Sequence, residues 1–351
     1  MAISETFTQN LHQHFRQGQD AALWDLEKLR KKTALKAGAL LAFWGILILL
    51  VLVPLTWKIS EITIQEYRTG EKDHEIILAG IALLLFIYLM AFFIYFNIKK
   101  KNILHQYLYS GKYAAQYRKE IKRKIIPFLK ENMTYHPEYG ISRDDFTQSG
   151  FPMFNHPKRY YSSGAITGEI GKTNFTFAEV LAEDMQEVKN EMIDSKQYTD
   201  LFRGVFFVAD FNKDTDWNTL VYPDGYKYFS KLLFMEEEEK YVRIKLEDVE
   251  FERYFEVYGT DQVESRYVLS QALMARILDF KKRAKKNIQF SFKNSKVYFG
   301  IHYPKGKDLF TPPLFRSVYE VKALENYILD IQLMLDIIEE LNLNSRLTFK
   351  P

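Results

Sequence analysis

Two long runs of apolar residues dominate the hydrophobic pattern near the start of the chain. Residues 37–57 and residues 76–98 contain no charged side chain; Lys36 and Lys58 flank the first run, and Lys99 follows the second. A helix rises about 1.5 Å per residue, so each run is long enough to cross a hydrocarbon core about 30 Å thick. A buried helix of a soluble protein is the alternative, but such helices seldom stay uniformly apolar beyond about 14 residues. The pattern therefore predicts a two-helix transmembrane hairpin with a short external loop at residues 58–75.

The distribution of Lys and Arg predicts how this hairpin is oriented. Residues 17–36 and residues 99–118 carry five basic side chains each, whereas the loop at 58–75 carries three. Cytoplasmic flanks are enriched in Lys and Arg, so both termini are predicted to be cytoplasmic. Residues 1–36 form an amphipathic cytoplasmic leader. They are not a cleaved signal peptide, because the apolar run behind them is too long and no small-residue cleavage site follows it.

A strongly basic segment follows the second apolar run. Between Lys99 and Lys130 there are ten basic residues and one acidic residue, Glu120, which makes residues 99–134 a basic helical neck. Each such charge near an anionic leaflet contributes about 1 kcal/mol of attraction, whereas a solvated helix face that only enforces topology explains the same pattern. Both interpretations remain open. The candidates for contact with anionic lipid head groups are Lys99, Lys100, Lys101, Arg118, Lys119, Lys122, Arg123 and Lys124.

The remaining residues, 135–351, show the mixed pattern of a cytoplasmic α+β domain with a largely antiparallel sheet. Short β-branched and aromatic runs predict strands, and the irregular alternation with helices excludes a doubly wound sheet. The expected strands are 165–170, 174–181, 201–211, 219–222, 241–246, 251–258, 288–292 and 296–303, and the start of 251–258 is also compatible with a helix. Two amphipathic helices are expected, at 271–285 after a Ser270 cap and at 317–341.

Composition narrows the classes of chemistry. The 351-residue chain is 47% hydrophobic, which is enough for a packed core, and it has no cysteine, which excludes disulfides and thiolate sites. Its formal net charge of +3 argues against nucleic-acid binding over the whole surface. The net charge of the whole chain hides the charge of +9 on residues 99–130, since the other residues then sum to −6.

No motif with catalytic or cofactor-binding chemistry is complete. Gly168 to Thr173 ends like a P-loop but has Ile166 where that motif requires glycine, so a hairpin turn is the better interpretation. The seven histidines show no metal-ligand spacing. We therefore expect no cofactor and no catalytic residue, which favours a protein that is not an enzyme.

A weak candidate for a divalent cation lies after the expected strand 201–211. Oxygen-bearing side chains fall at every second position, as in an EF-hand loop, but the required glycine and glutamate are replaced by Thr215 and Val221. A polar hairpin loop explains the pattern as well. The four candidates are Asp210, Asn212, Asp214 and Asp216.

Two blocks carry a resemblance to a known family. The first is Phe202 to Lys213 with Val221 to Asp224, and the second, more specific, is Phe251 to Leu269. With the two apolar runs, they resemble the bacterial domain-of-unknown-function-3137 membrane-protein family over roughly residues 110–345. That family is often encoded beside LemA, which implies a bacterial inner-membrane location and a LemA-like partner. It has no established catalytic residues to transfer.

The expected function is that of a membrane-anchored scaffold or adaptor. Its cytoplasmic domain would mediate protein–protein assembly, as a homo-oligomer and with other membrane proteins, and without nucleic acid. One alternative is a membrane-tethered enzyme or ligand sensor acting on a lipid or nucleotide, which predicts a pocket with convergent polar groups. A pore-forming oligomer is the other alternative.

Overall fold

The computed structural model divides the chain into two compact units. The α2 unit comprises His14–Arg118 and Thr311–Glu320, and the sheet unit comprises the rest of the chain. The structure describes residues 13, 21–69, 86, 89–90, 92–100, 103, 107, 111–129, 132–154, 156–190, 193–211, 216–225, 241–303, 312–320, 328–329, 331–332 and 334–340.

One helix accounts for most of the α2 unit. Helix α2 (Ala21–Thr69) is continuous over 49 residues, with Pro54 inside it. A second helical segment, residues 92–100, contacts it through Lys99, whose Nζ lies 5.2 Å from the Trp44 ring centroid. The Trp44 ring also meets the Tyr95 ring edge-on at 5.9 Å.

The predicted transmembrane hairpin requires a correction. Within the residues that the structure describes, no helix combines the length and the apolar character needed to cross a bilayer. The apolar run 37–57 is the middle of α2, which continues through Lys58 and Glu61 to Thr69 instead of ending in a loop. Most of the second run, 76–98, lies outside the described residues. A long helix and an antiparallel sheet therefore replace the hairpin in the description of the fold.

A buried polar clasp holds residues 312–320 against α2 in the same unit. Glu27 and Arg30 form an ion pair of 2.7 Å, and each side chain is little more than a tenth exposed. Arg30 Nη1 donates to the carbonyl of Leu314 at 2.8 Å, and Glu27 accepts from the backbone N–H of Val318 at 3.0 Å. Every polar atom of the clasp named here has a partner, as burial requires.

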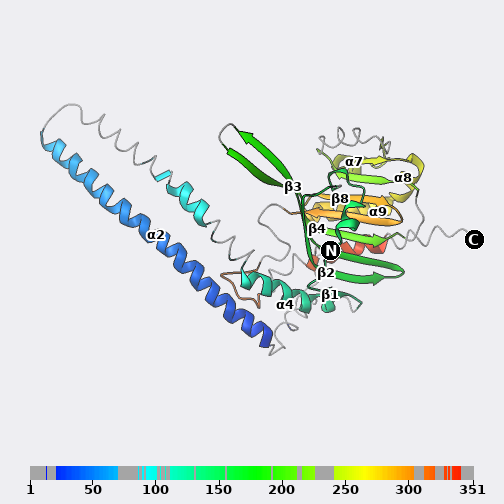
Figure 1. The fold of residues 1–351 in the computed structure, drawn as a ribbon, viewed down its shortest axis with the longest axis horizontal. Coiled ribbons are helices and arrows are strands. Elements are labelled where there is room, and N and C mark those ends of the chain that lie inside the picture. The colour runs from blue at the N-terminus through cyan, green and yellow to red at the C-terminus, as the bar shows by residue number, and fades with distance from the viewer. Residues whose placement is uncertain are drawn as a thin grey trace, which may run out of the picture. The chain divides into compact units, whose positions relative to one another are not determined.

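The described part of the sheet unit forms a nine-stranded antiparallel sheet (Figure 1). Its strand order is β1-β2-β3-β4-β9-β8-β5-β7-β6. The strands are β1 (Thr134–His136), β2 (Arg159–Ile170), β3 (Thr173–Asn190), β4 (Ile193–Asp210), β5 (Thr219–Pro223), β6 (Val242–Ile244), β7 (Phe255–Gly259), β8 (Ile288–Lys293) and β9 (Lys296–His302).

One side of the sheet, the cap face, is covered by residues that precede β2. Helix α5 (Arg143–Thr147) and the short 3-10 helix η2 (Pro152–Phe154) place buried aromatic rings on this face. The Phe146 ring stacks on Phe154 at 4.4 Å and meets Phe206 of β4 at 4.9 Å. These rings are the centre of the hydrophobic core, because aromatic side chains bury the largest apolar areas.

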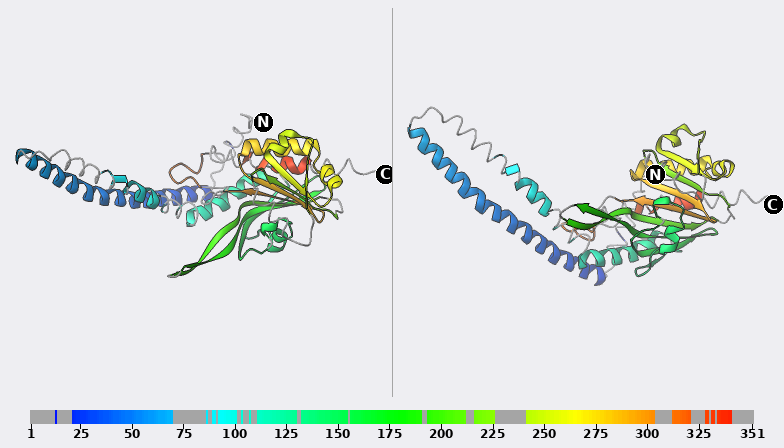
Figure 2. Two further views of the ribbon diagram at one scale, coloured as in Figure 1. Left: turned by 90° about the horizontal axis from the view of Figure 1, so that it is seen from above. Right: turned by 45° about the horizontal axis from the view of Figure 1, so that its top comes forward.

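Helices cover the opposite side, the helix face, near the β5–β7 end of the sheet (Figure 2, left). They are α7 (Val249–Tyr254), α8 (Gln262–Val268) and α9 (Gln271–Ala284). The Ser265 hydroxyl of α8 lies 2.8 Å from the Thr219 hydroxyl of β5, and the Phe251 ring of α7 stacks on Phe255 at 4.9 Å. Described residues 334–340 are also helical and reach α9 through the Arg276–Glu340 ion pair.

Several local predictions agree with this unit, and some need correction. The antiparallel sheet and the Ser270 cap of α9 are confirmed. The glycine-rich turn is confirmed as a hairpin, with Ile170 opposite Thr173 and a positive φ at Gly171. The helix expected at 317–341 is wrong at its start, because residues 317–320 form a turn.

Candidate binding site

Strands β3 and β4 extend far beyond their neighbours and form a two-stranded arm. Strand β2 ends its pairing with β3 at Arg159 opposite Glu183, and β9 ends its pairing with β4 at His302 opposite Gly204. Beyond these points, residues 184–190 of β3 and 193–200 of β4 pair only across this hairpin in the part of the chain that the structure describes, with Asp200 opposite Glu183 at its base. We call these two stretches the arm, and both views of Figure 2 show it leaving the sheet.

Among the described residues, no strand lies beside the outer edges of the arm. An isolated two-stranded hairpin is marginally stable in water, and a free edge is a template for pairing with another chain. The register places Glu187 opposite Lys196 and Lys189 opposite Asp194, so opposite formal charges match across the arm. The arm is therefore self-consistent as a hairpin but open to a further strand on each side.

Arg159 fixes the base of the arm. Its guanidinium carbon lies 3.3 Å from the centroid of the Tyr198 ring, and its Nη1 lies 3.9 Å from a Glu183 carboxylate oxygen. A guanidinium stacks well on an aromatic face and keeps its N–H groups for a carboxylate. Arg159, the last β2 residue paired with β3, thus contacts Glu183 just before the arm on β3 and Tyr198 within the arm on β4.

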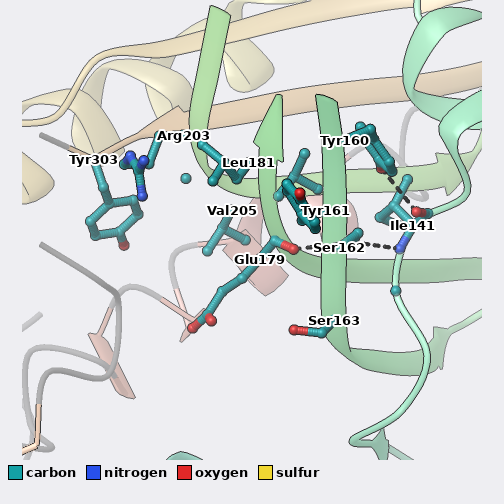
Figure 3. A pocket seen from close by; sticks show the side chains of 13 residues that line it. Ile141, Tyr160, Tyr161, Ser162, Ser163, Glu179, Leu181, Arg203, Val205 and Tyr303 are labelled. Carbon is teal, nitrogen blue, oxygen red and sulfur yellow. Dashed lines mark hydrogen bonds between the residues drawn. The ribbon is translucent and has the colours of Figure 1, made fainter. Parts of the chain in front are cut away.

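A trough of about 580 Å³ lies at the base of the arm (Figure 3). Its lining residues come from β2, β3, β4, the residue after β9, and the loop before α5. The register places the following lining residues on the helix face: Tyr161, Ser163, Glu179, Leu181, Arg203, Val205 and Tyr303. Tyr161 is 60% exposed, so this end of the helix face is open.

Glu179 is one of two charged groups in the trough, and a buried lysine neutralises it. Lys122 Nζ of helix α4 (Lys112–Leu129) lies 3.2 Å from Glu179 Oε1, and the lysine side chain is 4% exposed. The same ammonium lies 5.8 Å from the centroid of the Tyr135 ring. A Cβ at Gly164 would lie 2.9 Å from it, so the glycine makes room for the lysine. The Lys122–Glu179 ion pair is therefore an internal interaction of the fold, and it fixes the direction of the Glu179 carboxylate.

Arg203 is the other charged group, and a carboxylate holds it as well. Its Nε and Nη2 donate to the two oxygens of Asp200 at 2.8 and 3.3 Å. The Tyr303 backbone N–H donates to the Arg203 carbonyl at 2.8 Å, and this bond is the last step of the β9 ladder. Lys286 Nζ donates to the Tyr303 hydroxyl at 3.0 Å. Two parallel N–H···O bonds fix the plane of the guanidinium.

The Ser162 and Tyr160 hydroxyl groups of the trough form hydrogen bonds with backbone groups of the fold. Ser162 Oγ accepts from the Ile141 backbone N–H at 2.9 Å and donates to the Glu179 carbonyl at 3.1 Å. The Tyr160 hydroxyl donates to the Ile141 carbonyl at 2.9 Å, and burial raises the pKa of this phenol. The thirteen lining residues, all described, include no histidine to act as a base for a serine. The arrangement suits binding.

The weak metal candidates are not brought together as a site in the described residues. Asp210 ends β4 and Asp216 begins the next described stretch, whereas Asn212 and Asp214 lie outside it. No group of three potential metal-binding His, Asp or Glu side chains occurs among the described residues.

The predicted lipid-contact residues lie in different surroundings. Lys122 is buried against Glu179, and Arg123 is exposed and lies 3.9 Å from Glu120. Lys99 lies over Trp44, and Lys101 is outside the described residues. Lipid contact remains a prediction for this group, with Lys122 assigned to an internal ion pair.

Sequence reasoning missed the arm and the trough. The expected strands ended at Leu181 and began again at Leu201, because residues 183–200 lack an apolar alternation. One signal was available in the sequence: acidic and basic residues are spaced so that Glu187 is the register partner of Lys196, and Lys189 that of Asp194. Arg203, Glu179 and Tyr303 come from separate strands, and only the register brings them together.

Comparison with known proteins identifies a family but no activity. The model of a family described as "Protein of unknown function (DUF3137)" matches residues 200–343, which confirms the resemblance over that part of the chain. The match includes residues 200–210 of β4, with Arg203, and it includes Tyr303. It says nothing of a LemA neighbourhood, which remains a prediction. No curated protein and no solved structure matches the chain.

Proposed function

We propose, on the premise that residues 200–343 belong to the DUF3137 family of proteins of unknown function, that the sheet unit binds another polypeptide at the β3–β4 arm. The partner adds a strand to a free edge of the arm. In this mode, main-chain hydrogen bonds supply affinity and adjacent pockets supply specificity.

The observation that carries the proposal is the mismatch of strand lengths. Strands β3 and β4 have 18 residues each, whereas β2 has 12 and β9 has seven. Proteins commonly blunt free edges with short strands, bulges or covering elements, because a long free edge invites pairing. The arm keeps both edges free over residues 184–190 and 193–200 in the described structure, which favours an edge that is used.

The direct experiment shortens the arm without disturbing the sheet. Met185 and Tyr198 are opposite each other in the register, so an Asn-Gly turn can join them in place of residues 186–197. The full chain and this variant each carry a photo-crosslinking amino acid at Asp184, at the base of the arm. As a control, the full chain and the shortened variant also each carry the photo-crosslinking amino acid at Tyr139, which is 72% exposed and lies outside the arm.

The expected result is a crosslinked partner from position 184 of the full chain, identified and mapped by mass spectrometry. The crosslink should fall at least tenfold in the shortened variant, and position 139 should give no crosslink to the same partner. An equal yield from the full chain and the shortened chain, with both folded by circular dichroism, would contradict the proposal.

A further inference from the structure

We propose that the trough binds an extended main-chain segment of a polypeptide, with Arg203 donating to a peptide carbonyl and Glu179 accepting from a peptide N–H. The inference rests on the proposed function, since it names how the same partner is held beside the arm.

The charge balance of the trough favours a neutral, dipolar ligand. Glu179 has Lys122 as its counter-ion at 3.2 Å, and Arg203 has Asp200 at 2.8 Å. A fully charged ligand would therefore repel one member of each pair while attracting the other. A peptide group carries a donor and an acceptor with no net charge, so it gains hydrogen bonds without that conflict.

In each ion pair, one side-chain nitrogen or oxygen atom makes no hydrogen bond among the described residues. Arg203 uses Nε and Nη2 on Asp200, and Nη1 has no hydrogen-bond partner within the described part of the chain. Glu179 uses Oε1 on Lys122, and Oε2 has none among the same residues. Hydrogen bonds from a guanidinium or to a carboxylate are stronger than those between neutral groups. The trough thus presents one oriented donor group and one oriented acceptor.

The backbone positions that carry these two side chains are spaced like positions of an extended chain. Glu179 is opposite Val205, and Arg203 is two residues before Val205 on the same face, so the two charged residues are diagonal neighbours. Diagonal positions of an antiparallel pair are about 7–8 Å apart, and two residues of a strand span roughly 6.7 Å. Leu181 and Val205 complete the square between them and offer apolar surface to a side chain of the ligand.

A stacked aromatic ligand fits less well. Tyr161 and Tyr303 are three strands apart along one cross-strand row, which is about 14 Å at 4.8 Å per strand. Two rings that sandwich a third must be far closer than that, with centroids within about 7 Å of the central ring. The two tyrosines therefore mark the ends of the trough.

The test uses the full chain and a defined probe, the capped tripeptide acetyl-Ala-Leu-Ala-N-methylamide. Saturation-transfer NMR detects weak binding of such a probe through the leucine methyl groups. Three variants are compared with the wild type: Arg203→Gln removes the donor, Ser163→Trp fills the trough without deleting an interaction, and Arg243→Gln is the matched control. Arg243 pairs with Glu256 at 3.6 Å near the far edge of the sheet.

The expected result is a methyl signal that falls at least threefold in Arg203→Gln and in Ser163→Trp but not in Arg243→Gln. An absent signal in the wild type, or an unchanged signal in Ser163→Trp, overturns the inference. Displacement of the tripeptide by phosphate or acetate at equal concentration also overturns it, because the trough would then be an anion site.

Failure of peptide binding in the trough is distinguishable from failure of strand addition at the arm. The crosslink from position 184 depends on the arm, and Ser163→Trp leaves the arm intact. A retained crosslink with no tripeptide signal removes the trough from the account and leaves strand addition in place. A lost crosslink in the shortened variant together with trough binding of the tripeptide supports both.

Discussion

Gly204 lies where β4 passes directly beside β9. A Cβ at this position would lie 1.8 Å from the Ile301 carbonyl oxygen, which is far inside van der Waals contact. Gly204→Ala is therefore expected to push the two strands apart and to lower the free energy of unfolding by about 2–3 kcal/mol. Urea denaturation measures this loss. Gly38→Ala is the control, because a Cβ there meets nothing within 4 Å and alanine favours a helix. Equal midpoints for both variants would contradict this reading of the strand contact.

His302 gives the sheet unit a defined acid sensitivity. Burial lowers the pKa of this imidazole to about 4, and its ring meets the Phe202 ring edge-on at 4.7 Å. The unfolded chain takes up the proton near pH 6.5, so the contribution is complete above that pH and is lost as the pH falls toward 4. One such proton changes stability by at most about 1.4 kcal/mol per pH unit.

The variant His302→Phe should remove this sensitivity and keep an aromatic ring against Phe202. Urea midpoints at pH 7.5 and pH 5 are the measurement, and the wild type should lose more stability between them than the variant does. Identical losses would show that His302 does not carry the effect.

The clasp in the α2 unit titrates in a lower pH range. Burial alone would raise the pKa of Glu27, but hydrogen bonds from Arg30 and from the Val318 N–H outweigh it, and the net pKa is lowered. A lowered carboxyl pKa stabilises the folded state above the ordinary value of 4.5, and this stability is lost as the pH falls through the folded pKa.

Removal of Arg30 alone should be costly because it leaves Glu27 buried without a counter-ion. Arg30→Met is expected to cost about 3 kcal/mol at pH 7, whereas the double variant Glu27→Gln with Arg30→Met should cost less. Thermal unfolding followed by circular dichroism compares the two. A double variant that is less stable than Arg30→Met would contradict the assignment.

At the scale of elements, the sequence predicted strands and helices that bury an apolar face, because such a face produces a regular hydrophobic pattern. Strands β4, β8 and β9 carry dense apolar runs because the sheet is covered there, and Ser270 marks the start of α9. Residues 183–200 carry no apolar alternation, so the hydrophobic pattern does not predict the arm. Helix α5 and η2 are too short for periodicity, although they supply the central rings of the core.

The arm also has a dynamic signature in the absence of a partner. Its backbone hydrogen bonds belong to a two-stranded ribbon, whereas those of β8 and β9 lie inside the sheet. Amides of residues 184–190 and 193–200 should therefore exchange with deuterium at least tenfold faster than those of β8 and β9. Hydrogen exchange with peptide-level mass spectrometry measures both sets in one sample. Equal protection would mean that the arm is already covered.

At the scale of the whole molecule, the hydropathy pattern led to a wrong prediction of a transmembrane hairpin in the N-terminal third of the chain. A charge-free window was taken as a complete element, whereas α2 includes that window and continues into charged sequence on both sides. The predictions of localisation, lipid contact, a LemA-like partner and self-association remain predictions. So do the alternatives of an enzyme or ligand sensor and of a pore.

Exposed apolar side chains on α2 make one property of the full chain testable. Phe43, Ile46 and Leu50 are each more than half exposed. Clustered exposed apolar surface binds amphiphilic dyes, so the full chain should enhance the fluorescence of anilinonaphthalene sulfonate. Replacing the three residues with serine should lower that fluorescence by about a third or more, and an unchanged signal would contradict the exposure.

Strand addition at the arm is the central claim, and hydrogen exchange of the full chain with and without its crosslink-identified partner tests it most directly. An added strand pairs with the outward-facing N–H groups of one arm strand, so roughly half the amides of either residues 184–190 or residues 193–200 should become protected at least tenfold. The account predicts this alternating protection along one edge. Protection confined to other strands or helices, with both edges of the arm unchanged, would contradict it.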